Sequence, residues 1–319
     1  MFRPLLLAGL LVLLAPSVSG RESATFEPVL IQVPATPPVR SQPATPPGTD
    51  IYELAFDGTL ATLRSAKPAS IATDSGYENQ PFYTPDGTAI LFTANRDGKQ
   101  TDIYEFDRKT RRSRQLTATP EGEFSATITP DGKGFSVIRV EPDSTQRLWR
   151  FDRGGGNPRL VLTEIKPVGY HAWVDEDQLA LFVLGQPSTL QHARVSTGKA
   201  VVIAQSIGRS LHRIPRSQTV SFVHRESPNS VWVKQFDPAS GAVTPLVRLP
   251  ADKDERDVAW APDGTLLMSA GTKISAWRRG DQAWHEVLDV SSHKLGSVSR
   301  MAVAPDEQSL AIVVNEPAR

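Results

Sequence analysis

Cysteine is absent from all 319 residues of the sequence. This absence excludes disulfide scaffolds, thiol nucleophiles, cysteine-ligated zinc and iron–sulfur clusters, because each of them needs a cysteine sulfur. It also excludes a lipid attached to an N-terminal cysteine. The fold must therefore be stabilised by packing and hydrogen bonding alone.

An excess of charge of either sign is also missing, since Lys plus Arg and Asp plus Glu both number 35. Proteins that bind nucleic acid or anionic membranes in a general way use many basic side chains to neutralise phosphates. We therefore expect no nucleic-acid partner. Hydrophobic residues make up 39% of the chain, which is enough for one large core or two ordinary ones.

Two motifs of common catalytic centres are missing as well. The Gly-x-Ser-x-Gly sequence that propeller-bearing serine peptidases need in their hydrolase domain does not occur. Six histidines are present, but no His-x-x-x-His spacing points to a metal site. We therefore expect neither a metal nor a cofactor.

The apolar run near the N-terminus, Leu5 to Ala15, is short. Its 11 residues are too few to cross a bilayer as a helix, which takes about 20 residues. Arg3 precedes the run and small residues lead up to Gly20, which is typical of a secretory signal peptide. We predict a signal peptide over residues 1–20, export to the periplasm, and no membrane span after cleavage.

Residues 21–49 carry seven prolines and repeat the phrase Pro-Ala-Thr-Pro-Pro. Each proline removes a backbone donor and fixes φ, so this stretch predicts an extended tether rather than a helix or strand. The tether could be a spacer or a docking peptide, and its apolar part, Thr25 to Val33, could add to the sheet edge of a partner.

A recurring Pro-Asp-Gly phrase divides the rest of the chain into repeats. Its six copies, three of them altered, begin at Pro85, Pro130, Asp175, Pro215, Pro262 and Pro305. The intervals between them are 40 to 47 residues, so the sequence predicts six units of similar length.

Each unit contains four short strand-like segments. Asp-Gly between two apolar runs is a strong signal for a tight hairpin, because this turn needs positive φ. Third segments such as residues 102–107 and fourth segments such as residues 114–117 follow the hairpin. Helical periodicity is almost absent, so we predict an all-β fold, a six-bladed β-propeller of four-stranded antiparallel blades over residues 50–319.

The two ends of the repeat region are incomplete in complementary ways. The last repeat has two strands, 300–304 and 310–314, whereas residues 50–56 and 58–63 look like third and fourth strands without the first two. We expect these halves to form one blade, so that strands from both termini close the ring and leave no open edge between blades.

Three phrases resemble the WD-like repeat of the TolB propeller family: QPFYTPDG at 80–87, DIYEFD at 102–107 and QLT at 115–117. The resemblance covers about 270 residues and implies a propeller that acts in the cell envelope, where TolB bridges the Tol machinery and the peptidoglycan-associated lipoprotein. Residues 21–49 do not resemble the small α/β domain that precedes the propeller in TolB.

Residues that recur at one position of successive repeats are interpreted as structural. The turn residues Asp86, Asp131 and Asp263 are therefore not a carboxylate cluster. The aromatic residues just before the turns, Tyr83, Trp173 and Trp260, are expected to pack between blades.

Residues that differ between repeats are better candidates for a binding site. The position five residues before each turn is polar in every unit and should point to the propeller axis; it holds Gln80, Ser125, Tyr170, Ser210, Asp257 and Arg300. His171, His212, Arg213 and Arg256 lie nearby in the sequence. We predict that this ring forms a binding site at the channel mouth, although a water-filled rim would also explain it.

Two functions are compatible with such a ring. The first is a non-catalytic binding or scaffolding module for an envelope protein or polymer. The second is an enzyme, a lyase or hydrolase that acts on a glycan or peptide at the channel mouth. The ring is mixed and mostly neutral rather than rich in acid–base groups, which favours binding. We expect the protein to be a monomer.

Overall fold

The computed structural model describes residues 48–56, 63, 66–74, 76–96, 98–250 and 256–316. The predicted signal peptide and residues 21–47 of the predicted tether lie outside this set. Within the described residues, no helix has the length and apolar character needed to cross a membrane.

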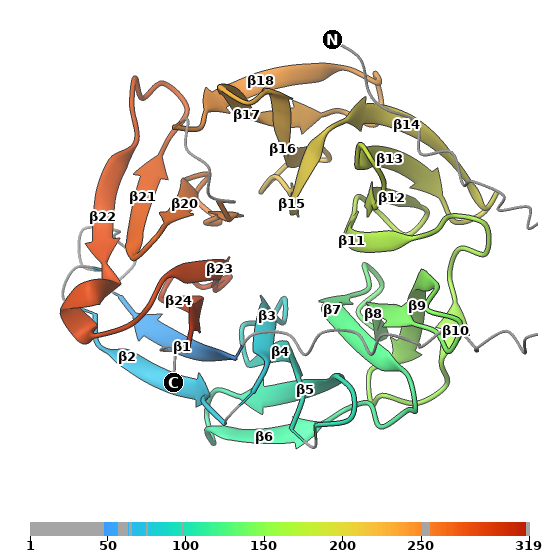
Figure 1. The fold of residues 1–319 in the computed structure, drawn as a ribbon, viewed down its shortest axis with the longest axis horizontal. Helices are drawn as coiled ribbons and strands as arrows, with labels where there is room; N and C mark the ends of the chain where they lie inside the picture. The colour runs from blue at the N-terminus through green and yellow to red at the C-terminus, as the bar shows by residue number, and fades with distance from the viewer. Residues whose placement is uncertain are drawn as a thin grey trace, which may run out of the picture. The chain divides into compact units, whose positions relative to one another are not determined.

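Six sheets, each of four antiparallel strands, surround a central channel (Figure 1). This arrangement confirms the predicted six-bladed β-propeller. We number the blades along the chain: blade 1 is β3 to β6, blade 2 is β7 to β10, blade 3 is β11 to β14, blade 4 is β15 to β18, blade 5 is β19 to β22, and blade 6 combines β23, β24, β1 and β2.

Each blade runs from an inner strand at the channel to an outer strand at the rim. The inner strands are β3 (Glu78–Tyr83), β7 (Gly122–Ile128), β11 (Val168–Trp173), β15 (Ile207–Arg213), β19 (Val258–Trp260) and β23 (Val298–Val303). The second strands are β4 (Ala89–Ala94), β8 (Gly134–Val140), β12 (Gln178–Val183), β16 (Val220–Ser227), β20 (Leu266–Ala270) and β24 (Ser309–Asn315).

The third strands are β5 (Asp102–Asp107), β9 (Gln146–Asp152), β13 (Thr189–Arg194), β17 (Ser230–Phe236), β21 (Lys273–Trp277) and β1 (Thr49–Ala55). The outer strands are β6 (Arg112–Gln115), β10 (Arg159–Leu160), β14 (Lys199–Gln205), β18 (Val243–Arg248), β22 (His285–Asp289) and β2 (Pro68–Ala72). A short 3-10 helix, η2 (Val290–His293), follows β22.

Blade 6 closes the ring as predicted. Strand β1 pairs with β24 in an unbroken register from Thr49 opposite Asn315 to Ala55 opposite Ser309. The first strand of the repeat region therefore starts one residue before the predicted boundary at residue 50.

The outer strand of blade 6 differs from the prediction. It is β2, Pro68–Ala72, and not the segment 58–63. Residues 57–62 are outside the described set, but Leu63 and Ala66 are buried in the cluster between blades 5 and 6. The connection thus places apolar side chains in the core before the outer strand begins.

The hydrophobic core lies between the facing sides of adjacent blades. One cluster joins Leu54 and Leu310 of blade 6 to Leu267 of blade 5. Another joins Leu91 of blade 1 to Phe135 of blade 2. Since each blade covers one face of the next, no blade buries its apolar faces without both neighbours.

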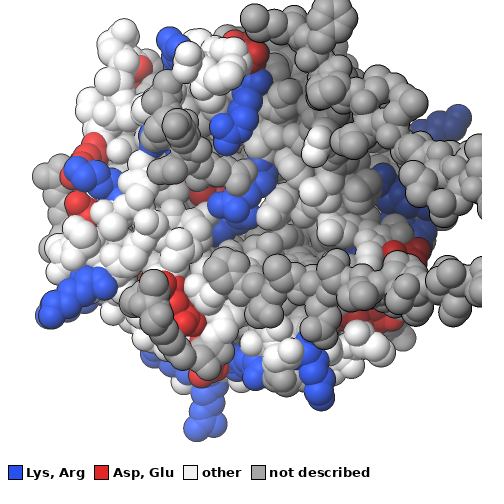
Figure 2. Space-filling view, viewed as in Figure 1, with Lys and Arg blue, Asp and Glu red and all other residues white. Residues whose placement is uncertain are grey.

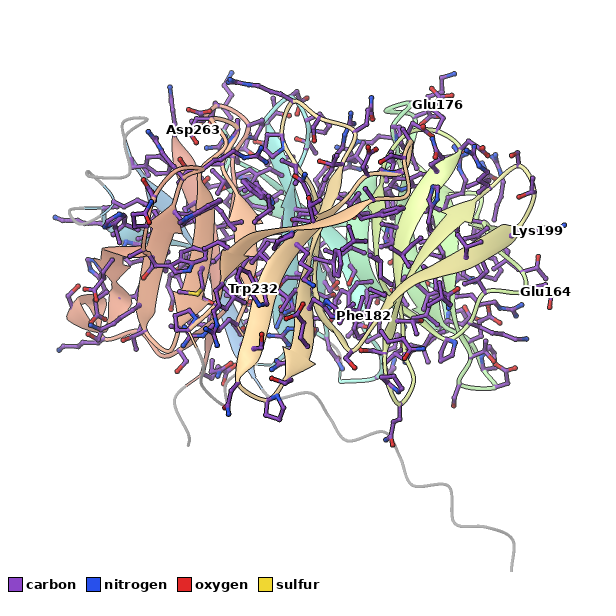
Figure 3. All side chains as sticks on the ribbon, turned by 90° about the horizontal axis from the view of Figure 1, so that it is seen from above. Glu164, Glu176, Phe182, Lys199, Trp232 and Asp263 are labelled. Atoms are coloured by element: carbon purple, nitrogen blue, oxygen red, sulfur yellow. The ribbon has the colours of Figure 1, made fainter. Side chains whose placement is uncertain are left out.

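The Pro-Asp-Gly turns behave as predicted. In blade 1, the Asp86 carboxylate accepts hydrogen bonds from the Thr84 hydroxyl at 2.5 Å and the Thr88 backbone N–H at 3.1 Å. Gly87 adopts φ 69°, the left-handed conformation that glycine tolerates best. The turns after the inner strands, including those of Glu176 and Asp263, lie on one face of the ring (Figure 3). The Asp residues are therefore turn residues.

The aromatic residues before the turns join neighbouring blades, as expected. Trp173 Nε1 of blade 3 donates to Ser136 Oγ of blade 2 at 2.8 Å, and Trp260 Nε1 of blade 5 donates to Ser221 Oγ of blade 4 at 2.8 Å. Tyr83 of blade 1 donates to Glu53 of blade 6 at 3.1 Å.

The closure of blade 6 can be tested by truncation. A chain that lacks residues 21–47 should melt at the same temperature as the full chain, because β1 is retained. Deletion of residues 21–72 should abolish cooperative unfolding, because it removes β1 and β2 and exposes the edge of β24. The buried side chains of Ile51, Leu54 and Ile71 contribute about 1.5–3 kcal/mol each, which together is comparable with the total stability of an ordinary domain, about 5–15 kcal/mol. Equal melting curves for the two truncations, measured by circular dichroism, would reject this closure.

The altered turn of blade 6 should be suboptimal. Glu307 stands at φ 57° where blades 1 and 2 have glycine. We expect Glu307→Gly to raise the free energy of unfolding by about 0.5–1 kcal/mol, because a Cβ is disfavoured in the left-handed region. Glu307→Ala, which keeps the Cβ, should give no such gain in urea unfolding.

Candidate functional site

The inner strands are irregular at the positions of the predicted ring. The pairing of β3 with β4 shifts between Asn79 and Phe82, and that of β7 with β8 shifts between Phe124 and Thr127. Gln80 and Ser125 lie inside these bulges with φ of 59° and 56°. Bulges often re-aim side chains near functional sites, and here they turn polar side chains toward the channel.

A cavity of about 600 Å³ occupies the channel, and side chains from all six blades line it. Its lining includes all six positions of the predicted ring: Gln80, Ser125, Tyr170, Ser210, Asp257 and Arg300. Figure 2 shows basic side chains at the centre of the ring on the face that it presents.

Of the other predicted site residues, His171, His212 and Arg213 also line the cavity. Arg256 is not among the lining residues; its Nη1 lies 3.7 Å from Met268 Sδ, and burial lowers the pKa of its guanidinium. Arg209 lines the cavity but was not a candidate in the sequence, because it lies one residue before the ring position. Its place directly before Ser210 in the sequence was the available signal.

A contact between opposite blades crosses the channel. Arg300 Nη2 of blade 6 donates to the Tyr170 hydroxyl of blade 3 at 2.7 Å. The same guanidinium lies over the Tyr170 ring, 5.1 Å from its centroid. The rings of Phe182 and Tyr170 pack in a T-shaped arrangement, with centroids 5.7 Å apart. A cationic and aromatic pair therefore forms the middle of the site.

Asp257 is held by groups from two other blades. Its carboxylate accepts from Ser210 Oγ of blade 4 at 2.8 Å and from the Met301 backbone N–H of blade 6 at 2.8 Å. Arg300 Nη1 lies farther away, at 3.7 Å. The two short bonds come from neutral donors, and the ion pair with Arg300 adds an attraction at longer range.

The remaining ring positions form a separate cluster between blades 1 and 2. Gln80 Oε1 accepts from Thr93 Oγ1 at 3.0 Å and from the Ser125 backbone N–H at 2.8 Å. The amide of Gln80 therefore satisfies the N–H that the bulge at Ser125 removes from the strand ladder.

The two histidines have different surroundings. His171 is 7% exposed, and its Nε2 lies 2.7 Å from Ser136 Oγ, which also accepts the bond from Trp173. Burial lowers the pKa of His171 to about 3. Burial also lowers the pKa of His212, against the opposing effect of the nearby Asp257 carboxylate. Both imidazoles are consequently neutral at pH 7.

The Ser136–His171 pair is not an accessible nucleophile and base. Ser136 is fully buried, so a substrate in the cavity does not reach its hydroxyl. Among the described residues, no group of three His, Asp or Glu side chains could hold a metal ion together. The cavity instead presents a guanidinium, a phenol, amides and hydroxyls, which suit recognition by hydrogen bonds.

Comparisons with known proteins support the fold and its TolB-like character. No family model matches the sequence. A solved structure from Agrobacterium tumefaciens assigned as TolB aligns with a TM-score of 0.66 at 14% identity, over 85% of this chain and 99% of that one. TolB from Acinetobacter baumannii aligns with a TM-score of 0.57 at 14% identity, over 85% of this chain and 65% of that one.

A chain of a nidogen–laminin complex also aligns, with a TM-score of 0.53 at 9% identity, over 68% of this chain and 82% of that one. At these identities the likeness concerns the fold. The predicted resemblance to TolB propellers is confirmed at that level.

The buried state of His171 predicts a pH effect on stability. The unfolded chain binds a proton on this residue below about pH 6.5, whereas the folded chain does so only near pH 3. Stability should therefore fall as the pH falls through this window, by about 2 kcal/mol between pH 7 and pH 5. The His171→Asn variant should not lose this part of its free energy of unfolding between pH 7 and pH 5, which urea unfolding at the two pH values would measure.

The exposed histidine of β22 provides a matched control. His285→Asn should keep the pH dependence of the parent protein. If the two variants lose stability equally on acidification, His171 is not the group responsible.

Proposed function

We propose that this chain is a non-catalytic binding module of the periplasm that engages an envelope protein or polymer through the channel cavity. The observation that carries the proposal is the cavity itself, to which all six blades contribute polar side chains around the Arg300–Tyr170 pair. The proposal includes a signal peptide over residues 1–20 and a tether over residues 21–49 that either spaces or docks.

The composition of the cavity supports binding over catalysis. His171 is buried and neutral, His212 is half-buried and neutral, and Asp257 is held by two short hydrogen bonds. General acid–base catalysis requires groups that exchange protons near neutral pH and reach the substrate. Arg and Tyr side chains, by contrast, are common anchors of protein interfaces.

The contacts of Arg300 suggest the chemistry of the bound group. The guanidinium has a phenol on one side and a carboxylate at 3.7 Å on the other, and that carboxylate is already satisfied by closer donors. Arg209 adds a second guanidinium to the lining. A carbonyl or carboxylate oxygen of the partner is the group that complements these donors.

The similarity in fold to TolB structures supports an envelope role by analogy. Such analogy does not identify the partner. It agrees with export, which the N-terminal pattern of a secretory signal supports.

The proposal is tested by the variants Tyr170→Phe and Arg300→Ala, alone and together. Tyr170→Phe keeps the ring and removes only the hydroxyl, so the fold should be retained. Each change should weaken capture of cross-linked envelope partners, by about tenfold for every 1.4 kcal/mol of lost interaction, with anchors typically losing about 1–2 kcal/mol.

Arg194→Ala is the control, because this exposed arginine does not line the cavity and its Nη1 pairs with Asp177 Oδ2 at 3.2 Å. Undiminished capture by the double variant would move the site away from the channel. A large drop in its melting temperature would instead mean that the pair serves to hold opposite blades together. Hydrolysis or cleavage of envelope glycans or peptides by the purified protein would contradict a purely binding role.

A further inference from the structure

The channel cavity opens on the face of the propeller that carries the turns. In blades 1 and 2 the ring position and the first residue of the turn both line it, Gln80 with Pro85 and Ser125 with Pro130. Five residues of a strand extend roughly 15 Å, so the cavity is deep as well as narrow. The turns lie on one face (Figure 3), and a ligand therefore enters from there.

Two arginines that lie side by side form the floor of the cavity. Arg209 of blade 4 and Arg300 of blade 6 both donate to the backbone carbonyl of Ser299, from Nη2 at 3.1 Å and from Nη1 at 3.4 Å. With the bond from Arg300 to the Tyr170 hydroxyl, these contacts join blades 3, 4 and 6 across the channel. They separate the cavity from the face opposite the turns.

Tyr77 lies behind this floor. It precedes Gln80 at the start of blade 1, away from the turn, and it does not line the cavity. Burial raises the pKa of its phenol and Tyr170 raises it further, whereas Arg300 and Arg209 oppose the rise. The phenol is therefore close to all three side chains. A ligand that enters from the turns meets the two guanidinium groups last.

Positive charge predominates among the described side chains that line the cavity. Three arginines and two aspartates are present: Arg209, Arg213, Arg300, Asp131 and Asp257. Asp131 Oδ2, at the mouth, lies 3.5 Å from Arg150 Nη2, which is not part of the lining. A negatively charged group at the floor would therefore be stabilised by the guanidinium groups.

The wall between the floor and the mouth combines apolar side chains with hydroxyls. Phe82 of blade 1, Ile128 of blade 2 and Trp173 of blade 3 line it. Thr127 lines it as well, and its hydroxyl has no partner among the described residues. An alkyl chain would use only the apolar part of this wall, whereas a peptide also offers amide groups to the hydroxyl. The lining therefore favours a peptide.

We propose that the cavity binds the C-terminal end of a polypeptide, which enters from the turn face with its carboxylate toward Arg209 and Arg300. Its last side chains pack against Phe82, Ile128 and Trp173. The cavity of about 600 Å³ falls within the usual range of ligand sites, roughly 300–1,000 Å³, so it admits a few residues rather than a folded domain. This inference rests on the binding function proposed above and specifies the partner as a free chain end.

A pool of random hexapeptides tests the inference on protein produced from the full-length sequence. Half of the pool has free C-terminal carboxylates and half is amidated. Immobilised protein should retain the free acids at least tenfold over the amides, because an amide carries no charge for the guanidinium groups. The retained peptides, identified by mass spectrometry, should have apolar residues at their last two positions.

Two conservative variants separate the parts of the site. Arg209→Gln keeps a donor near Ser299 but removes the charge, so it should reduce the preference for free acids at least fivefold. Thr127→Val keeps the shape and removes the hydroxyl, so it should weaken the binding of acids and amides alike, by about fivefold. Arg194→Ala is the control outside the cavity and should change neither. Circular dichroism melting of all three variants checks that the fold is retained.

Equal retention of acids and amides would overturn the proposal, as would retention of neither. Selective retention of amidated peptides that contain Asp or Glu would assign the floor to a side-chain carboxylate instead. Dodecanoate that binds where no peptide does would assign the cavity to an amphiphile. The function proposed for the channel fails separately, because it requires only that changes at Tyr170 and Arg300 weaken the capture of envelope partners.

Discussion

The pairing of β1 with β24 is the constraint on which the rest of the propeller depends. Because the core lies between blades, every blade needs two neighbours, and an open ring would leave apolar faces exposed at both ends of the array. Seven consecutive residue pairs from Thr49 to Ala55 join the first described strand to the last. The six inner strands converge on one channel only because this pairing closes the ring.

Convergence of the inner strands also creates the polar cavity. Neighbouring inner strands crowd together near the axis, and bulges there release backbone groups from the ladders. Side chains such as Gln80 and Asp257 satisfy these groups across blade boundaries. The same side chains that stabilise the inner ring thus line the cavity, so stability and recognition share residues at the centre of the molecule. The effects of these side chains on stability and on recognition can be separated only with variants that keep the packing, such as Tyr170→Phe.

Local features of the sequence predicted most of the fold. The Pro-Asp-Gly turns and the strand lengths were sufficient for the blade number, because they form a short-range pattern that recurs in six units. The incomplete repeats at the two ends were sufficient for the closure. The residue five positions before each turn also lines the cavity in all six blades. The contact of Arg300 with Tyr170 across the channel was not predictable, since it joins residues 130 positions apart through the three-dimensional ring. The outer strand at Pro68 was missed because an edge strand has only one pairing partner to specify it.

The centre and the rim of the propeller present different kinds of surface, and this difference matters for binding. The cavity at the axis offers hydrogen-bonding groups from all six blades, whereas β14 at the rim exposes the apolar side chains of Val201 and Val202. A partner recognised by hydrogen bonds can therefore occupy the cavity without covering the rim.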